Sequence, residues 1–362
     1  MNFDRVWNFS AGPGVLAEEV LLRAQKEMMN YNGTGMSVME MSHRSGAYQE
    51  IFAHTKSQFR KLMHVPDEYE ILFLQGGATT QFAMVPLNFL KENRGADYAV
   101  TGNFAGAAFR EAGKYGTMHC AYDGTKDGFT HIPSQSELVL DPSASYFHYC
   151  ANNTIFGTEW NYIPDTGDVP LICDMSSDIT SRVVDISRYG LIYAGAQKNM
   201  APAGVTVVII RKDLAGHQRA DTPVMLNYDT MIKKDSMYNT PPCWCIYMLG
   251  LTLDWLEECG GVEAMEQKKH AKAMLLYDAL ENSTLFKLHA DKESRSDMNV
   301  TFRTGDEELD RKFIAEAADA GFVNLKGHRL SGGMRASIYN AMPEEGVMCL
   351  RDFIEEFDRI NK

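Results

Sequence analysis

Short apolar runs alternate with amphipathic stretches through the first two thirds of the chain. The runs are continuous in apolar character and rich in β-branched and aromatic residues, which is typical of strands buried on both faces of a sheet. Helical patterns such as residues 80–91 and 105–115 separate several of them. Strands that alternate with helices predict a mostly parallel sheet in an α/β domain. The predicted strands are residues 69–74, 98–101, 145–151, 169–174, 191–194 and 205–211.

The pattern of apolar positions changes near residue 245. Long helices are predicted there, the second of them with lysines and acids on its outer face. We therefore expect a large α/β domain over residues 16–255 and a small α+β domain formed by residues 1–15 and 256–362. The elements predicted in this part are helices 246–258, 262–282, 307–320 and 345–360 and strands 298–303 and 334–337.

The formal net charge is −13, from 35 Lys and Arg against 48 Asp and Glu. A charge this negative disfavours nucleic acid or an anionic membrane as a partner. By the same reasoning it would disfavour an anionic substrate. Apolar residues make up 45% of the 362 residues, which is enough for a large core and ordinary for a globular protein.

The seven cysteines are scattered, and no two form a CxxC pair. This usage favours reduced thiols over a disulfide framework or a zinc site. The N-terminus shows no apolar signal-peptide core, and no run approaches the roughly 18 apolar residues of a membrane span. We expect a cytoplasmic enzyme that holds no metal.

Three polar features follow apolar runs, and ligands bind at the carboxyl ends of strands in open α/β sheets. Asp174 ends one run, where a buried carboxylate needs a partner, although a helix cap or turn is an alternative. Lys198 follows the next run among small residues and is either a buried nucleophilic amine or a solvated loop lysine. The glycine turn GGATTQF at residues 76–82 opens a helix, and its free N–H groups suit a phosphate or simply connect two elements.

Together these features suit one cofactor, pyridoxal phosphate. An aspartate would keep the pyridine nitrogen protonated, a lysine would carry the aldehyde as an imine, and the glycine turn would take the phosphate.

Five longer motifs make a family resemblance visible: NFSAGPG, SVMEMSHRS, IYAGAQKNMAPAG, YNTPP and LKGHRLSGGMRASIYNAMP. They closely resemble those of the phosphoserine aminotransferase family, which are class-V pyridoxal-phosphate enzymes of fold type I. The resemblance runs from Asn8 to the C-terminus. It implies a large domain with a mostly parallel seven-stranded sheet between helices, a smaller α+β domain, and a homodimer with shared active sites.

The resemblance also implies roles for individual residues. Lys198 would be the Schiff-base lysine and proton carrier, and Asp174 would pair with the pyridine nitrogen. Further cofactor contacts would come from Ala78, Thr79, Phe104, Thr154 and Gln197, and from Asn239 and Thr240 of the neighbouring subunit. Some members have an arginine where this chain has Thr79, which bears on phosphate affinity more than on the reaction.

Substrate recognition can be argued from charge. Phosphoserine and glutamate each carry an α-carboxylate and a second anionic group, which arginine binds through paired hydrogen bonds. Residues 320–343 contain no Asp or Glu, although a solvated basic loop is an alternative explanation. By resemblance, the α-carboxylate would bind Arg335, and the second anionic group would bind His328, Arg329 and the partner's pair His43 and Arg44.

We therefore predict reversible transamination between O-phospho-L-serine with 2-oxoglutarate and 3-phosphohydroxypyruvate with L-glutamate, in serine biosynthesis. In some bacteria the family also acts on a phosphorylated hydroxythreonine in pyridoxine biosynthesis. Two alternatives stay open at this point. One is another class-V enzyme, such as an alanine–glyoxylate type aminotransferase or a cysteine desulfurase. The other is a non-catalytic binding or regulatory module with this fold.

Overall fold

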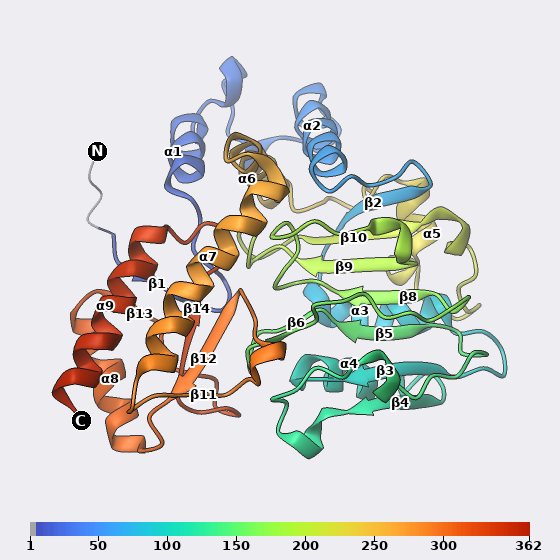
Figure 1. The fold of residues 1–362 in the computed structure, drawn as a ribbon. Helices are drawn as coiled ribbons and strands as arrows, with labels where there is room; N and C mark the ends of the chain where they lie inside the picture. The colour runs from blue at the N-terminus through green and yellow to red at the C-terminus, as the bar shows by residue number, and fades with distance from the viewer. Residues whose placement is uncertain (1–4) are drawn as a thin grey trace.

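A seven-stranded sheet forms the centre of the larger part of the molecule (Figure 1). The computed structural model describes residues 5–362. The strands lie in the order β2-β10-β9-β8-β5-β3-β4, and β10 runs antiparallel to both of its neighbours while the other pairs are parallel. The strands are β2 (Tyr69–Leu74), β3 (Ala96–Val100), β4 (Met118–Asp123), β5 (Phe147–Cys150), β8 (Leu171–Asp174), β9 (Leu191–Gly195) and β10 (Thr206–Arg211).

Each of the six strands predicted for the α/β domain overlaps an observed strand of this sheet. The apolar pattern does not predict β4. This strand lies at the edge of the sheet and is only half-buried, so its sequence MHCAYD lacks the continuous apolar run of the inner strands. The mostly parallel α/β architecture is confirmed.

Helices cover both faces of the sheet because neighbouring residues of a strand point to opposite sides. In β2, Ile71 and Phe73 belong to one buried apolar cluster, and Leu72 and Leu74 belong to another. The first cluster includes residues of α2 and α6, and the second includes residues of α3, α4 and α5. The helices of this part are α1 (Glu18–Glu27), α2 (Gly46–Leu62), α3 (Gly77–Phe89), α4 (Asn103–Ala112), α5 (Tyr228–Lys233) and α6 (Cys243–Glu258).

A second, smaller sheet lies in the C-terminal part, with strand order β11-β12-β14 and antiparallel pairing. The N-terminal strand β1 (Trp7–Asn8) joins this part by pairing with β13 (Phe322–Val323). A separate apolar cluster lies here and includes Phe9. The remaining elements are the hairpin β6 (Asn152–Asn153) and β7 (Thr158–Glu159), strands β11 (Lys287–Leu288), β12 (Asn299–Arg303) and β14 (Met334–Ser337), and helices α7 (Gly261–Asn282), α8 (Glu307–Asp319) and α9 (Glu344–Ile360).

Helix α7 is present as predicted for residues 262–282, but not all of its lysines lie on the outer face. Two of its lysines, Lys269 and Lys272, are buried, with 3% and 4% of their surface exposed. Lys269 pairs with Glu159, and Lys272 donates to the backbone carbonyls of Tyr339, Asn340 and Met342. A lysine can be buried when acceptors surround its ammonium group, so the outer-face assignment is wrong for these two residues. Within residues 5–362, no helix is long and apolar enough to cross a bilayer.

The stability of the C-terminal apolar cluster should depend strongly on Phe313, which is fully buried. Its ring centroid lies 5.0–5.7 Å from those of Phe286, Phe302 and Phe357. We expect Phe313→Ala to lower the free energy of unfolding by about 3–5 kcal/mol in urea denaturation, because it leaves a cavity. Met29→Ala is the control, because that side chain is 83% exposed. A loss below about 1 kcal/mol for Phe313→Ala would contradict the packing described.

Candidate active site

Strands β8 and β9 bring an acid and an amine to one edge of the large sheet. The two strands are parallel neighbours, Asp174 is the last residue of β8, and Lys198 follows β9 by three residues. The Lys198 amine donates a hydrogen bond of 2.6 Å to Thr154 Oγ1, from the turn after β6. It also lies 5.6 Å from the ring centroid of Phe104 at the start of α4. Four residues predicted from the sequence therefore meet around one amine.

The Lys198 amine is poorly solvated. Burial lowers the pKa of Lys198 to about 8, although the nearby carboxylate of Asp174 acts in the opposite direction. An amine with a pKa near 8 is uncharged in about a tenth of the molecules at pH 7, against fewer than about one in a thousand for an ordinary lysine, and only the uncharged form is nucleophilic.

Asp174 is buried at the end of its strand. Burial raises the pKa of Asp174, while hydrogen bonds from Ser176 and the charge of Lys198 oppose that shift. The Ser176 N–H donates to Asp174 Oδ1 at 2.9 Å. This carboxylate is placed to hold a positively charged ring nitrogen, because an added cation would favour its ionised form.

The glycine turn after β2 forms the N-terminus of α3. Gly76 has a φ of +91°, and a Cβ there would lie 2.0 Å from Thr80 Oγ1, so the turn requires glycine. No side chain caps the helix, and Ala78 and Thr79 occupy its first turn. Its N–H groups are therefore available to a phosphate. On β9, a Cβ at Gly195 would lie 2.6 Å from Gln197 Oε1, so the Gln197 side chain lies over the end of that strand.

The acid-free segment of the small sheet supplies positive charge. Arg335 on β14 donates to the backbone carbonyl of Thr154 at 3.0 Å, and its buried Nε has no partner among residues 5–362. Burial lowers the pKa of Arg335. Burial and the charges of Arg335 and Arg329 lower the pKa of His328. An anion bound here would be attracted by both arginines and would favour protonation of His328, so the segment is suited to bind one.

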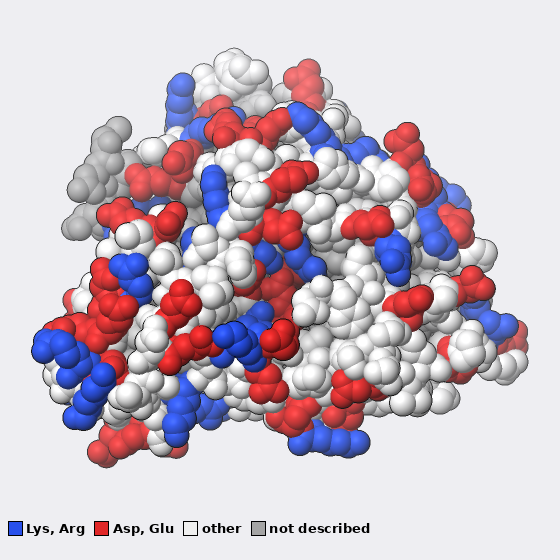
Figure 2. All heavy atoms as spheres, in the orientation of Figure 1, with Lys and Arg blue, Asp and Glu red and all other residues white. Residues whose placement is uncertain are grey.

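Charge at this site differs from charge on the outer surface. Figure 2 shows acidic and basic side chains interspersed over the face drawn, consistent with a net charge of −13 spread across the molecule. The net charge therefore does not exclude an anionic substrate. The expectation that a charge of −13 disfavours such a substrate is wrong, because it describes the whole surface and not the site.

The four residues assigned by resemblance to the neighbouring subunit lie elsewhere. His43 and Arg44 precede α2, and Asn239 and Thr240 precede α6. The Gln49 side chain donates to the His43 carbonyl at 2.6 Å and contacts Met237 Sδ, so the two segments are neighbours. Within residues 5–362, no hydrogen bond joins these four residues to Lys198, Asp174 or Arg335.

Sequence reasoning assigned no contact to the N-terminal SAGPG turn. Gly12 has a φ of +151°, and a Cβ there would lie 3.7 Å from the Lys198 side chain. A Cβ at Gly14 would lie 2.8 Å from both the Lys198 carbonyl and the Tyr339 ring. The turn therefore packs against Lys198. Its two closely spaced glycines were the available signal, because glycine allows this close approach.

The described residues fit pyridoxal phosphate. A nucleophilic amine, a buried carboxylate, an uncapped helix N-terminus and an aromatic ring follow the carboxyl ends of β9, β8, β2 and β3, which run in the same direction, and each matches one part of that cofactor. The unpartnered Nε of Arg335 leaves a donor for a bound anion.

Comparison with known proteins agrees with this geometry. Residues 6–350 match the family model "Aminotransferase class-V". The chain therefore belongs to the class-V aminotransferases, whose chemistry depends on pyridoxal phosphate.

Within that class, the chain is similar over nearly its whole length to phosphoserine aminotransferases. Phosphoserine aminotransferases from Lysinibacillus sphaericus and Laribacter hongkongensis are each 50% identical to this chain over 98% of its length, and they are covered to 98% and 99%. The solved phosphoserine aminotransferase from Bacillus circulans subsp. alkalophilus superposes with a TM-score of 0.97 at 48% identity, covering 99% of this chain and 100% of that one. By these comparisons the chain is a member of the phosphoserine aminotransferase family.

A more distant likeness shows the fold alone. An alanine–glyoxylate aminotransferase from Nostoc sp. superposes with a TM-score of 0.77 at 17% identity, covering 99% of this chain and 96% of that one. This likeness shows the fold that a glyoxylate-type enzyme shares with the chain, and it does not carry that enzyme's activity to it.

The lowered pKa of Lys198 can be tested on the cofactor-free protein. We expect its acylation by a small reagent to rise with pH and to reach half its maximal rate near pH 8, because the uncharged amine reacts. Mass spectrometry of the digested protein measures the rate, and the exposed lysines provide the reference, since an ordinary lysine has a pKa of about 10.4. A half-maximal rate near that ordinary value would contradict the burial argument.

Proposed function

We propose that this chain catalyses reversible transfer of an amino group between O-phospho-L-serine and 2-oxoglutarate, with 3-phosphohydroxypyruvate and L-glutamate as the other pair. The observation that carries the proposal is that Arg335, from the acid-free segment that also holds His328 and Arg329, reaches the carbonyl of Thr154, whose hydroxyl accepts from the buried Lys198. Both amino-acid substrates have an α-carboxylate and a second anionic group. Two anionic groups need more than one cation to neutralise them in a partly buried site.

Bound pyridoxal phosphate supplies an aldehyde for the amino group and a protonated ring that withdraws electrons from the substrate. Lys198 is the nucleophilic amine that would hold the cofactor's aldehyde, and as a free amine it would carry the proton between the substrate Cα and C4′ of the cofactor. Thr154 orients the amine through its 2.6 Å hydrogen bond. Asp174 holds the ring nitrogen, because a buried carboxylate is stabilised by an adjacent cation.

The other cofactor contacts follow from the same geometry. The N-terminus of α3, with Ala78 and Thr79, binds the phosphate through backbone N–H groups, and Gln197 adds an amide donor. The ring of Phe104 covers one face of the pyridine. Thr79 contributes a hydroxyl where some family members contribute an arginine.

Substrate binding is divided between two positions. Arg335 takes the α-carboxylate, because its buried guanidinium reaches the Thr154 carbonyl beside Lys198. His328 and Arg329 take the phosphate or the second carboxylate. These paired hydrogen bonds orient the substrate so that its Cα–H bond faces the Lys198 amine. Binding raises the rate mainly through this orientation.

We further propose a homodimer in the cytoplasm, with His43, Arg44, Asn239 and Thr240 completing the partner's site. Large apolar side chains flank these segments and are exposed: Met39 by 58% and Tyr238 by 47%. Exposed apolar side chains near polar ones are typical of an interface.

We also propose that each chain has two domains. The large domain consists of residues 16–255, and the small domain consists of residues 1–15 together with residues 256–362. Helix α6 spans the proposed boundary at residue 255.

The roles of the arginines can be separated by their substrates. We expect Arg335→Leu to lower kcat/KM for both 3-phosphohydroxypyruvate and pyruvate as amino acceptors, because both carry the α-carboxylate. Arg329→Leu should lower it for the phosphorylated acceptor only. Losing one charge-assisted contact costs about 1.5–3 kcal/mol, or about ten- to a hundredfold.

Steady-state kinetics with 3-phosphohydroxypyruvate, pyruvate and glyoxylate measure these effects. Arg311→Leu is the matched control, since that arginine is exposed on α8 and pairs only with Glu307 and Glu308 among residues 5–362. Equal losses with both acceptors would overturn the phosphate role of Arg329. A preference of the unaltered enzyme for glyoxylate would overturn the proposed substrate.

The shared active site can be tested by mixing variants. Lys198→Ala removes the amine of a chain's own site, and Arg44→Leu impairs the site of its partner. A mixed dimer, isolated with two affinity tags, should have one intact site and about half the activity of the unaltered dimer. If the mixed dimer shows only the mean activity of the two variant homodimers, the sites are not shared.

A further inference from the structure

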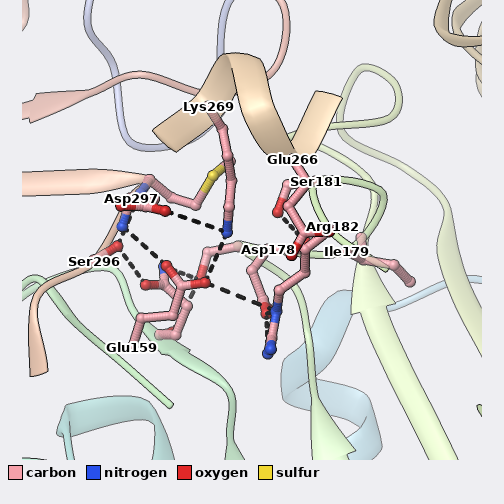
Figure 3. Close-up of polar contacts among 12 residues, drawn as sticks. Glu159, Asp178, Ile179, Ser181, Arg182, Glu266, Lys269, Ser296 and Asp297 are labelled. Carbon is pink, nitrogen blue, oxygen red and sulfur yellow. Dashed lines mark hydrogen bonds and ion pairs between the residues drawn. The ribbon is translucent and has the colours of Figure 1, made fainter. Parts of the chain in front are cut away.

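A buried cluster of charged side chains lies between α7, the β6–β7 hairpin and the turn that follows β8 (Figure 3). Lys269 Nζ lies 2.9 Å from Glu159 Oε1 and 3.9 Å from Asp297 Oδ2. Arg182 binds Asp178 Oδ2 through Nε at 3.1 Å and through a terminal nitrogen at 3.0 Å. The side chains of Asp178 and Lys269 are 1% and 4% exposed.

The pairing of charges in this cluster leaves Asp178 incompletely compensated. Lys269 faces both Glu159 and Asp297, and Asp297 also faces the exposed His270 at 3.2 Å. Arg182 pairs with Asp178 but also lies 3.8 Å from Glu159. Burial raises the pKa of Asp178 to about 6, against the opposing charge of Arg182. Asp178 Oδ1 has no hydrogen-bond partner among residues 5–362. Keeping such a group buried is unfavourable, so its retention calls for a role beyond stability.

The Asp178–Arg182 ion pair closes a turn with a strained backbone. Thr180, inside this turn, has a φ of +61°, which is unfavourable for a β-branched residue. The Asn340 side chain holds the Thr180 carbonyl at 2.9 Å. Strain of this kind persists only where the surrounding contacts enforce it, and it is concentrated at functional sites.

The same turn is attached to Lys198. The side chain of Asn199, the next residue, donates to the Ile179 carbonyl at 3.1 Å and accepts from the Asn340 N–H at 3.0 Å. Asp174 lies four residues before Asp178, so the turn joins both central residues of the site. Thr154 is attached as well, because Glu159 ends the hairpin whose other strand immediately precedes Thr154.

Asp178 also acts on Lys198 through its charge. Its carboxylate is among the groups that raise the pKa of Lys198 against the effect of burial. The other groups that influence the Lys198 amine are Asp174, Cys150 and Arg335, and those facing Asp178 are Arg182, Glu159 and Lys269.

We propose that Asp178 is a positioning residue for the reaction. The ion cluster holds the Asp178–Arg182 turn in its strained form. Through that turn the cluster fixes the position of Lys198 and the electrostatic field at the Lys198 amine. The proposal rests on the proposed function only in taking Lys198 as the reacting amine. It does not depend on which amino acid is the substrate.

The test uses the holoenzyme and the visible absorption band of its cofactor, whose pH midpoint reports protonation of the Lys198 nitrogen. Removing a nearby negative charge makes protonation harder. We therefore expect Asp178→Asn to move the midpoint to lower pH by at least about half a unit. Arg182→Lys keeps the charge and should keep the midpoint.

The matched control is Asp97→Asn. Asp97 is, like Asp178, a buried aspartate, with 2% of its surface exposed. It is hydrogen-bonded to His119 and to the Asp141 N–H. It lies near the start of β3, at the opposite ends of the parallel strands from Lys198. We expect Asp97→Asn to lower the unfolding temperature without moving the midpoint.

If Asp178→Asn does not fold, Asp178→Asn with Arg182→Met removes both charges of the pair and leaves neither unpaired. Arg182 is not among the main groups that act on the Lys198 amine, so the midpoint should still move to lower pH, by less than in the single variant. An unchanged midpoint with lowered thermal stability would overturn the proposal, and so would an equal shift in Asp97→Asn. Because no phosphoserine enters the titration, this result is distinguishable from failure of the Arg329 substrate test.

Discussion

The Lys198 amine is held where water cannot fully solvate its charge, and the arrangement of the site follows from that constraint. Burial favours the reactive uncharged form, yet the amine still needs polar neighbours to remain in place. Asp174 and Thr154 provide them from a strand end and from a turn, respectively. The parallel pairing of β8 and β9 brings these groups together, because parallel strands end at the same edge of a sheet.

The second constraint is the distribution of charge between the two parts of the molecule. The large sheet supplies the amine and the acid, and the small sheet supplies Arg335. Pairing of Thr301 with Arg335 places this arginine within a strand of that sheet, and its guanidinium reaches the Thr154 carbonyl. An arginine positioned in this way loses little freedom on binding a carboxylate, which favours tight recognition despite the negative net charge.

The buried ion cluster shows that polar groups in this protein connect segments far apart in the chain. Glu159, Lys269 and Asp178 come from a hairpin, a helix and a turn that meet in this cluster. Lys272 similarly joins α7 to three carbonyls near residue 340. Such contacts contribute less to net stability than to a defined arrangement, because desolvation offsets much of the attraction between charges.

The apolar pattern was enough to predict six strands of the large sheet, helices α3, α4 and α6 to α9, and the polar residues at strand ends, because these depend on local periodicity and on the step from apolar to polar residues. Asp174 and Lys198 could be found in this way. Helices α1, α2 and α5 were not predicted. Strand β4 could not be predicted, since Ala121 is its one buried residue and the strand therefore has no apolar run. That Lys269 is buried depends on tertiary contacts, because a helical pattern does not show whether an acid such as Glu159, 110 residues away, lies opposite.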